Sequence, residues 1–573
     1  MKEFEITDDN RPYLDARGKI VLNACPGSGK TSAIAFKLKR LAEECLNKHG
    51  TFAGIACLSF TNVAKAEIAT KFHSLHGKQF DFPHVVMTLD SFINQFVTLP
   101  FYYLLNKQAK RPVILDVVSF LDQMTVGRYF AKSRQPLAKI LKPSKLKYEL
   151  DGTISWGGHQ PNFATVDPAI FDEYAKTYKK WQTQNGYLNN DDSTYIAYRL
   201  LLKYPRIATA LIERFPYIIV DEAQDTSEIQ YKIFDLLLNA GLSNIEYVGD
   251  PYQSLYEFRE ARPDLFVDRF NDTANWRPLR LKDCRRTSQE IIDGYSIFRS
   301  SSETAITSTC KHSSDHRIKV LRYDPANLDD LISRYESLID SAKENTILVR
   351  GSTHLEMFGA KPTAEEPWKN SAALTLINAR KNFDLGNIKA AVDGMRTFLA
   401  EIQLPDADHR TRSEHLESLK SDRDLNLKLF NFLQQIPSHN MGLQNWTNMT
   451  TGLILKDLNI QVDFELKQKG KAFYALNLLQ TLFPARETKF PVTTVHKVKG
   501  MTFHSVMLVL SENSTAANIS LAEFVKPTGL PTEKQRMIYV ALSRPQVLAC
   551  IAVPNSISEA VITARLGANI DFV

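Results

Sequence analysis

The segment ACPGSGKT, at residues 24–31, constrains the fold more than any other part of the chain. It follows the apolar, β-rich run IVLNA and precedes the amphipathic pattern SAIAFKLKRLAEECL, so we expect a strand, a glycine turn and a helix in succession. Gly27 and Gly29 let the backbone wrap closely around phosphate oxygens, which N–H groups of the loop and the helix start would bind. The segment therefore predicts an α/β domain with a nucleoside triphosphate at the edge of a parallel sheet.

The residue types in this loop predict an ATP site and part of a Mg²⁺ site. Lys30 supplies a positive charge to the β- and γ-phosphates, and Thr31 a hydroxyl to Mg²⁺. Ala24 replaces the usual first glycine, so the match is imperfect. The nucleotide-binding residues expected from the loop are Ala24, Pro26, Gly27, Ser28, Gly29, Lys30 and Thr31.

Two further loops with polar side chains follow buried strands, DEAQD after YIIV and GDPYQS after IEYV. Asp221 can hold Mg²⁺, and Glu222 can polarise the attacking water. Gln253 can sense the γ-phosphate because its amide both donates and accepts hydrogen bonds, and Asp250 is a further nucleotide-binding candidate. The three loops together predict a nucleoside triphosphatase.

The buried runs fall into two sets, which predicts two parallel sheets, each interrupted by a mostly helical insertion. The first domain is expected in residues 1–95 and 201–275, around an insertion at 96–200. The second is expected in residues 276–354 and 488–573, around a shorter insertion at 355–487.

Composition narrows the setting of the chain. No run of 18 apolar residues predicts a membrane-spanning helix, and the acidic start MKEFEITDDN lacks the apolar core of a signal peptide. Six cysteines without a C-x-x-C pair argue against a zinc site and a disulfide framework. We therefore expect a cytoplasmic protein with no membrane partner. The net charge of +6 permits a polyanionic partner without demonstrating one.

Seven segments, in order, resemble motifs of the UvrD/Rep/PcrA-type superfamily 1A DNA helicases. They read SFTNVAKAEI, MTLDSF, NNDDSTYIAYRLL ahead of DEAQD, GDPYQSLYEFREA, LKDCRRTSQEII, TTVHKVKGMTFHSVMLV and KQRMIYVALSR. The resemblance covers both sheet domains but not the insertions. It implies a P-loop NTPase with two RecA-like motor domains, and ATP hydrolysis with Mg²⁺ between them that drives 3′-to-5′ travel on single-stranded DNA or at single/double-strand junctions.

The resemblance also implies roles for individual residues. Arg285 and Arg544 match family arginines that reach across the cleft to the γ-phosphate, and Gly500 is a further nucleotide-binding candidate. Bases would stack on Phe60, Phe258 and Arg259, although core packing is the alternative for the two phenylalanines. The residues expected to hold phosphates or sugars of the strand are Thr61, Asn62, Thr88, Thr494 and His496.

Three alternatives stay open: an RNA motor of the same superfamily, a nucleotide-gated sensor or assembly subunit that switches a partner nuclease without processive unwinding, and an inactive scaffold. The complete set of acids and arginines argues against the last. The short second insertion and the short segment after KQRMIYVALSR predict a motor without its own nuclease. This layout resembles GajB-like helicase subunits of the Gabija anti-phage system, so we expect a partner nuclease and a role in antiviral defence. The oligomeric state stays open.

Overall fold

The computed structural model divides the chain into two compact units, which are described one at a time. One comprises Met1–Leu348 and Val495–Val573, and the other Val349–Thr494. The described residues are 4–105, 110–115, 121–122, 126–157, 161–256, 260–300, 303–311, 317–351, 354–355, 358, 367–370, 372–384, 388–405, 412, 415–416, 418–420, 422–437, 441–466, 490–515, 518–567 and 570–573. In this part of the chain, none of the helices has the length and apolarity that a bilayer crossing needs.

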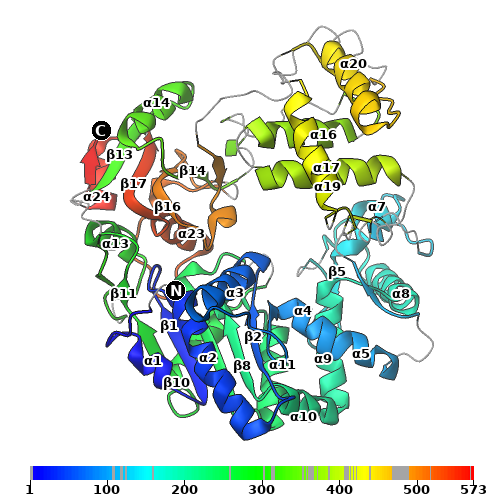
Figure 1. The fold of residues 1–573 in the computed structure, drawn as a ribbon, viewed down its shortest axis with the longest axis vertical. Helices are drawn as coiled ribbons and strands as arrows, with labels where there is room; N and C mark the ends of the chain where they lie inside the picture. Colours follow the sequence, from blue (N-terminus) through cyan, green and yellow to red (C-terminus); the bar gives the residue numbers. More distant parts are fainter. Residues whose placement is uncertain are drawn as a thin grey trace. The chain divides into compact units, whose positions relative to one another are not determined.

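The first unit contains a six-stranded sheet in the order β10-β1-β9-β8-β2-β3 (Figure 1). Its strands are β1 (Lys19–Ala24), β2 (Ile55–Ser59), β3 (Val85–Thr88), β8 (Tyr217–Asp221), β9 (Asn244–Gly249) and β10 (Arg277–Leu281). Every pairing is parallel, so the carboxyl ends of all six strands meet at one edge. Because β10 pairs with β1, this sheet extends to Leu281, beyond the boundary predicted at residue 275.

Helices cover both faces of this sheet. On one face lie α1 (Arg11–Asp15), α2 (Lys30–His49) and α3 (Asn62–His76), which bury an apolar cluster with the strands. On the other face lie α9 (Asn190–Lys203), α10 (Pro205–Arg214), α11 (Glu228–Asn239) and α12 (Pro263–Asn271). Burial on both faces explains why the central strands are continuous apolar runs.

The segment predicted as the first helical insertion contains helices and two small sheets. Its described helices include η1 (Asn94–Thr98), α5 (Leu99–Phe101), α7 (Leu137–Ile140) and α8 (Pro168–Asn185). Two-stranded sheets join β4 (Val113–Ile114) to β7 (Tyr187–Leu188) and β5 (Leu146–Tyr148) to β6 (Ile154–Trp156). A buried ion pair of 2.6 Å between Lys179 and Asp192 ties α8 to α9, which begins inside the predicted insertion and packs on the first sheet.

A second six-stranded sheet has the order β15-β14-β16-β17-β13-β18. Its strands are β13 (Ile318–Tyr323), β14 (Asn345–Val349), β15 (Val492–Thr494), β16 (Phe503–Val509), β17 (Pro545–Pro554) and β18 (Ile570–Phe572). The pairings among β13, β14, β16, β17 and β18 are all parallel. Two parallel sheets with helices confirm the predicted α/β class with two RecA-like domains.

The helices of the second sheet are α13 (Gln289–Ser296), α14 (Leu328–Leu338), α23 (Glu533–Leu542) and α24 (Glu559–Leu566). Buried side chains of α13 and α23 form one apolar cluster with Cys25, Tyr252 and Leu255, which come from loops of the first sheet. The two sheet domains therefore share a hydrophobic contact, and the loops that carry the polar motifs lie beside it.

Apart from β15, the unit Val349–Thr494 is mostly helical in its described part. It contains α16 (Ala372–Asp384), α17 (Ile388–Gln403), α19 (Arg423–Gln435), α20 (Leu443–Leu453) and η7 (Ile454–Leu458). Its core is built around the buried rings of Trp368 and Trp446, with centroids 5.6 Å apart. The predicted insertion at residues 355–487 falls inside this unit, and its last part, 467–487, lies outside the described residues.

Candidate active site

The loop after β1 has the geometry that its glycines predicted. Gly27 and Gly29 have φ angles of 75° and 82°, in the left-handed region that favours glycine, and α2 begins directly afterwards at Lys30. A Cβ atom on Gly27 would lie 2.6 Å from Cβ of Arg286, so a side chain there would displace the arginine segment. Ser28 is buried, and its hydroxyl has no hydrogen-bond partner among the described residues. The loop is therefore shaped as a phosphate cradle at the carboxyl end of a strand.

The two acids of DEAQD lie against the lysine of this loop. Asp221 ends β8, and Glu222 follows with a φ of 54°, which is uncommon for a residue other than glycine. Nζ of Lys30 donates to Oε1 of Glu222 at 2.6 Å and lies 3.4 Å from Oδ1 of Asp221. The lysine that would bind phosphates is therefore paired with both carboxylates in this structure.

The pKa values of the two acids move in opposite directions. Burial raises the pKa of Asp221, although the charge of Lys30 opposes the shift. Burial also disfavours the charged form of Glu222, but Lys30, and after it Lys499, outweigh burial and lower the pKa of this carboxyl to about 2. Adjacent carboxyl groups with opposed shifts are typical of sites where one oxygen binds a cation and the other handles a proton.

The donor set fits a magnesium ion that is completed by substrate. Oδ1 of Asp221 is buried and accepts no hydrogen bond from the described residues, and its ion pair of 3.4 Å with Lys30 would be exchanged for the metal ion when Lys30 turns to the phosphates. The hydroxyl of Thr31, in the first turn of α2, is the second expected ligand. Within the described ranges, no three His, Cys, Asp or Glu side chains form a metal cluster. Mg²⁺ commonly takes one or two protein oxygens and completes its shell with phosphates and water, so two donors suffice.

The loop after β9 connects the first sheet to an arginine of the second. Nε2 of Gln253 donates to Oδ2 of Asp250 at 2.8 Å, and Oε1 of Gln253 accepts from Nη2 of Arg544 at 2.6 Å. The hydroxyl of Tyr539, on α23, also donates to Oδ2 of Asp250, at 3.2 Å. Sequence analysis predicted Gln253 and Arg544 as separate candidates, and the structure brings them into direct contact.

A second arginine near Arg544 is Arg286, which sequence analysis did not single out. Its Nη1 donates to the carbonyl of Ser543 at 2.8 Å, one residue before Arg544. Burial, and then the charge of Arg286, lowers the pKa of Arg544 to about 9, which still leaves Arg544 charged at neutral pH. The two guanidinium groups are therefore close enough for their charges to interact. The adjacent arginines in KDCRRT are the signal that could have indicated both candidates.

Arg285, the arginine predicted from this segment, lies against another part of the phosphate loop. Its Nη1 would be 3.5 Å from a Cβ atom on Gly29, and its backbone N–H donates to the carbonyl of Gly27 at 2.9 Å. The catalytic role of Arg285 stays a prediction. Gly500, predicted near the nucleotide, has a φ of 82° and open space beside its Cα atom.

Candidate strand contacts lie at the same edge of the first sheet. The ring of Phe60, which follows β2, lies 5.0 Å from the ring of Tyr256, at an interplanar angle of 30°. Phe60 is partly exposed, so it is not the core residue of the alternative interpretation. Sequence analysis did not predict Tyr256, because the motif comparison indicated two neighbouring residues instead. Those residues, Phe258 and Arg259, lie outside the described part of the chain.

The predicted phosphate contacts occupy helix starts and the segment after β15. The hydroxyls of Thr61 and Thr88 accept from backbone N–H groups at the starts of α3 and of α4 (Leu89–Ile93), each at 3.2 Å, and Asn62 is the first residue of α3. Thr494 ends β15, and Nε2 of His496 lies 3.9 Å from Oε1 of Glu533. Helix starts are suited to anions, but the caps already give both threonines a structural role.

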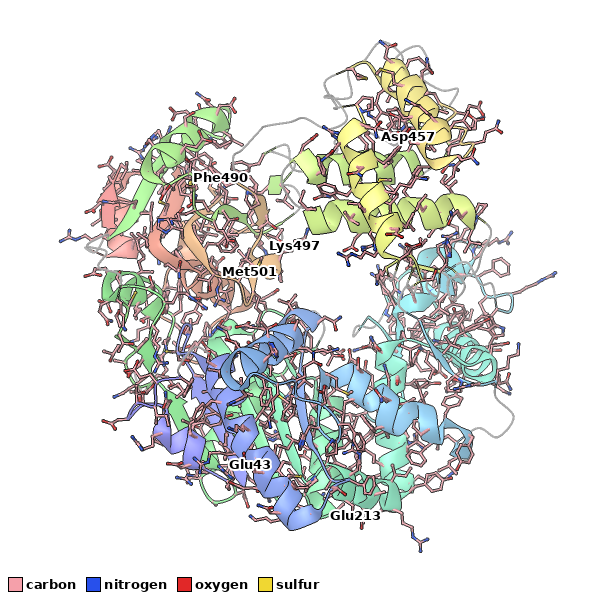
Figure 2. All side chains as sticks on the ribbon, viewed as in Figure 1. Glu43, Glu213, Asp457, Phe490, Lys497 and Met501 are labelled. Carbon is pink, nitrogen blue, oxygen red and sulfur yellow. The ribbon has the colours of Figure 1, made fainter. Side chains whose placement is uncertain are left out.

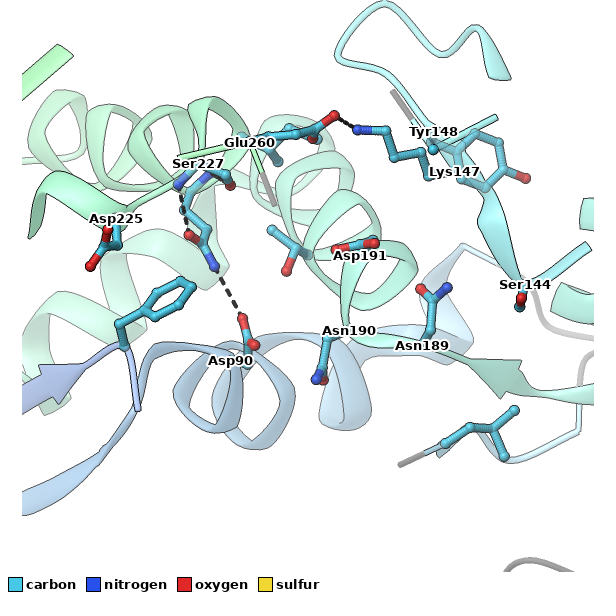
Figure 3. A pocket seen from close by; sticks show the side chains of 16 residues that line it. Asp90, Ser144, Lys147, Tyr148, Asn189, Asn190, Asp191, Asp225, Ser227 and Glu260 are labelled. Atoms are coloured by element: carbon cyan, nitrogen blue, oxygen red, sulfur yellow. Dashed lines mark hydrogen bonds and ion pairs between the residues drawn. The ribbon is translucent and has the colours of Figure 1, made fainter. Parts of the chain in front are cut away.

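A cavity of about 370 Å³ opens beside Phe60 (Figure 3). Asp90, on α4, accepts from Nε2 of Gln230 at 3.0 Å, and Lys147 is paired with Glu260. Asp225, the last acid of DEAQD, also lines the cavity. The catalytic loop, through Asp225, and the ring of Phe60 therefore border a common space.

A phosphate loop, an acid pair and a glutamine–arginine contact between two parallel sheets define the class of P-loop proteins with two RecA-like domains. Residues 7–274 match the family of the UvrD/REP helicase N-terminal domain. This match and the named relatives support the resemblance to the UvrD/Rep/PcrA superfamily 1A helicases that the sequence motifs indicated. The narrower likeness to Gabija helicase subunits stays a prediction.

Relatives with curated names match the chain over different shares of its length. The chain is 24% identical to the ATP-dependent DNA helicase PcrA of Staphylococcus epidermidis over 68% of this chain and 53% of the relative. It is 27% identical to PcrA of Bacillus subtilis, over 48% of this chain and 36% of the relative. It is 28% identical to the exonuclease/helicase subunit RexA of Streptococcus pneumoniae, over 29% of this chain and 14% of the relative. The chain thus spans about half the length of the first relative and less of the others.

Proposed function

We propose that this protein is an ATP-dependent DNA helicase or translocase that moves 3′ to 5′ along single-stranded DNA. The observation that carries this proposal is the hydrogen bond of 2.6 Å between Gln253 of the first sheet and Arg544 of the second. A contact of this kind lets nucleotide binding and hydrolysis change the fit between two domains, which is the physical requirement of a motor.

The phosphates of ATP would replace the carboxylates as partners of Lys30. Lys30 is held by Glu222 at 2.6 Å, and its transfer to the phosphates releases Glu222 to orient a water molecule and accept its proton. Thr31 and Asp221 would hold Mg²⁺, which supplies charge that offsets negative charge on the phosphates. Nε2 of Gln224 also donates to Oε2 of Glu222, at 2.6 Å, and would keep this carboxylate oriented after Lys30 leaves.

Arginines of the cleft would make hydrolysis depend on closure. Arg544 and Arg286 are neighbouring cations, and their mutual repulsion is relieved when a γ-phosphate lies between or beside them. Gln253, which already touches Arg544, would exchange this partner for the γ-phosphate or its product. Loss of the γ-phosphate removes the anion that would hold these arginines of the second domain against the phosphate loop of the first, so closure alternates with opening.

The strand would cross the edge of the first sheet at the stacked pair of Phe60 and Tyr256. Stacking on aromatic rings accepts any base, which a motor that passes every sequence requires. Two of the named relatives are called ATP-dependent DNA helicases, and this favours DNA over RNA as the polymer.

We further propose that the chain is the motor subunit of a bacterial DNA-processing or anti-phage complex with a partner nuclease. The Streptococcus pneumoniae relative is named an exonuclease/helicase subunit, and the layout of the sequence resembles helicase subunits of anti-phage systems. Co-purification of a nuclease with the tagged chain from its native host supports this proposal, and a chain that purifies alone under the same conditions contradicts it.

The steady-state ATPase rate, measured with oligo-dT, with oligo-U and without a strand, tests the main proposal. We expect strong stimulation by DNA that disappears in Lys30→Ala and Glu222→Gln, while Glu213→Gln, an exposed acid on α10, behaves as the unchanged protein (Figure 2). Removal of a general base typically costs about 10²–10⁴-fold in rate. Stimulation by RNA alone would reassign the polymer. An ATPase that ignores both strands would favour the nucleotide-gated subunit.

A further inference from the structure

Lys499 connects the second sheet domain to the catalytic loop of the first. It follows the short helix η8 (Val495–Val498), and Gly500, with its positive φ, turns the chain directly after it. Its side chain is 8% exposed and forms an ion pair with Asp225, which is 1% exposed. The same Nζ lies 3.9 Å from Oε2 of Glu222. One buried ammonium group is therefore shared between the second and the last acid of DEAQD, Glu222 and Asp225.

The same ammonium group also lies over one of the stacked rings. Nζ of Lys499 is 5.1 Å from the centroid of the Tyr256 ring, within the range of a cation–π interaction. Tyr256 in turn stacks on Phe60, and Phe60 and Asp225 line the same cavity (Figure 3). Contacts that run from Phe60 through Tyr256 to Lys499 therefore end at the carboxylate of Glu222.

These contacts make the position of Lys499 sensitive to what occupies the rings. A base that enters between Phe60 and Tyr256 must move one ring relative to the other, because the two rings are in contact, with centroids 5.0 Å apart. The ammonium group of Lys499 then either moves with the Tyr256 ring or loses contact with it. In both cases the distances from this group to Asp225 and Glu222 change. Charges this close and this buried interact strongly, so a small shift redistributes the pairing.

We propose that Lys499 is a positioning residue that makes ATP hydrolysis depend on the bound strand, by holding Glu222 in its resting position until a base occupies Phe60 and Tyr256. The inference rests on the proposed function and adds to it the residue that joins the strand contact to the hydrolytic carboxylate. Lys499 itself touches neither ATP nor the strand in this scheme. It acts through Asp225, Glu222 and Tyr256.

The test compares ATPase rates of Lys499→Met, Lys499→Arg and the unchanged protein, with and without oligo-dT, together with the KM for ATP and the Kd for the strand. Lys497→Met is the matched control, because Lys497 lies two residues earlier and is exposed (Figure 2). Because Lys499→Met releases Glu222 from its resting position, we expect it to raise the strand-free rate at least tenfold and to keep the strand-stimulated rate within about threefold, so that the stimulation ratio falls. Lys499→Arg should restore part of the stimulation, and Lys497→Met should behave as the unchanged protein.

Two outcomes would overturn the inference: a stimulation ratio within about threefold of that of the unchanged protein, as an equal fall of both rates from a merely structural role would give, or a strand-free rate that does not rise. Lys499→Met could fold poorly because Asp225 is left buried and unpaired. Lys499→Met/Asp225→Asn removes that charge, and the ratio of its ATPase rates with and without oligo-dT then tests the inference. Absence of stimulation in the unchanged protein refutes the proposed function instead, so the two failures are distinguishable.

Discussion

Arg285 and Arg286 are adjacent in sequence, and the structure gives them different surroundings that a pair of substitutions can separate. Arg286 donates to the backbone beside Arg544, whereas Arg285 lies against the loop at Gly29. We therefore predict that Arg286→Ala lowers kcat for ATP, while Arg285→Ala mainly raises KM.

The magnitude follows from the role of an arginine that stabilises charge in the transition state. Such an arginine contributes about 10³–10⁵-fold to kcat, which corresponds to about 4–7 kcal/mol. Because Arg544 lies beside Arg286 and keeps one cation in the cleft, we expect the lower limit, about 10³-fold, for Arg286→Ala. The fold should survive, since one hydrogen bond to Ser543 contributes only about 1 kcal/mol.

The assay is steady-state ATP hydrolysis with saturating oligo-dT, with thermal unfolding of each variant as the control for folding. We expect kcat of Arg285→Ala to stay within about tenfold of the unchanged protein. The reasoning is refuted if Arg285→Ala loses as much kcat as Arg286→Ala, or if Arg286→Ala loses less than about tenfold.

Three further substitutions test the fold, the strand contact and the loop. Lys179→Met should lower the free energy of unfolding in urea by about 3–5 kcal/mol, because it leaves Asp192 buried without its cation. Lys179→Met/Asp192→Leu should recover most of this loss. Equal stability of the single and the double variant would contradict this prediction. Phe60→Ala should weaken oligo-dT binding, measured by fluorescence anisotropy, by about 1–3 kcal/mol, whereas Phe52→Ala, at an exposed ring, should not; equal losses would point to a general effect on the fold. Gly27→Ala should raise the KM for ATP at least tenfold, because φ is 75° and its Cβ would lie 2.6 Å from a side chain; an unchanged KM would show that the loop adapts.

Continuous apolar runs made the central strands predictable. The runs at 20–24 and 217–222 coincide with β1 and β8 because these strands are buried on both faces. Sequence analysis missed β10, which reads RPLRL and lies at an edge of its sheet, and β13, which reads IKVLRY, because charged residues interrupt both apolar patterns. Strands of two or three residues, such as those of the first insertion, are too short for any periodicity to indicate them.

Loops that contain several functional residues were predictable, and contacts between domains were not. Lys30, Asp221 and Glu222 follow strands of one parallel sheet, so the sequence order alone places them at one edge. The contact of Lys499 with Asp225 joins residues of two sheets, and no local pattern encodes which side chain crosses between them. Arg286 was missed for the same reason, since only the packing against Ser543 separates it from its neighbour.

Stopped-flow translocation on oligo-dT of increasing length, labelled at the 5′ end, tests most directly whether this protein is an ATP-driven motor on single-stranded DNA. With ATP and Mg²⁺, we expect a signal whose lag grows in proportion to length, and no length-dependent lag with a 3′-end label or with Glu222→Gln. A strand-stimulated ATPase that gives no length-dependent lag with either label would contradict the motor and identify the chain as a nucleotide-gated subunit.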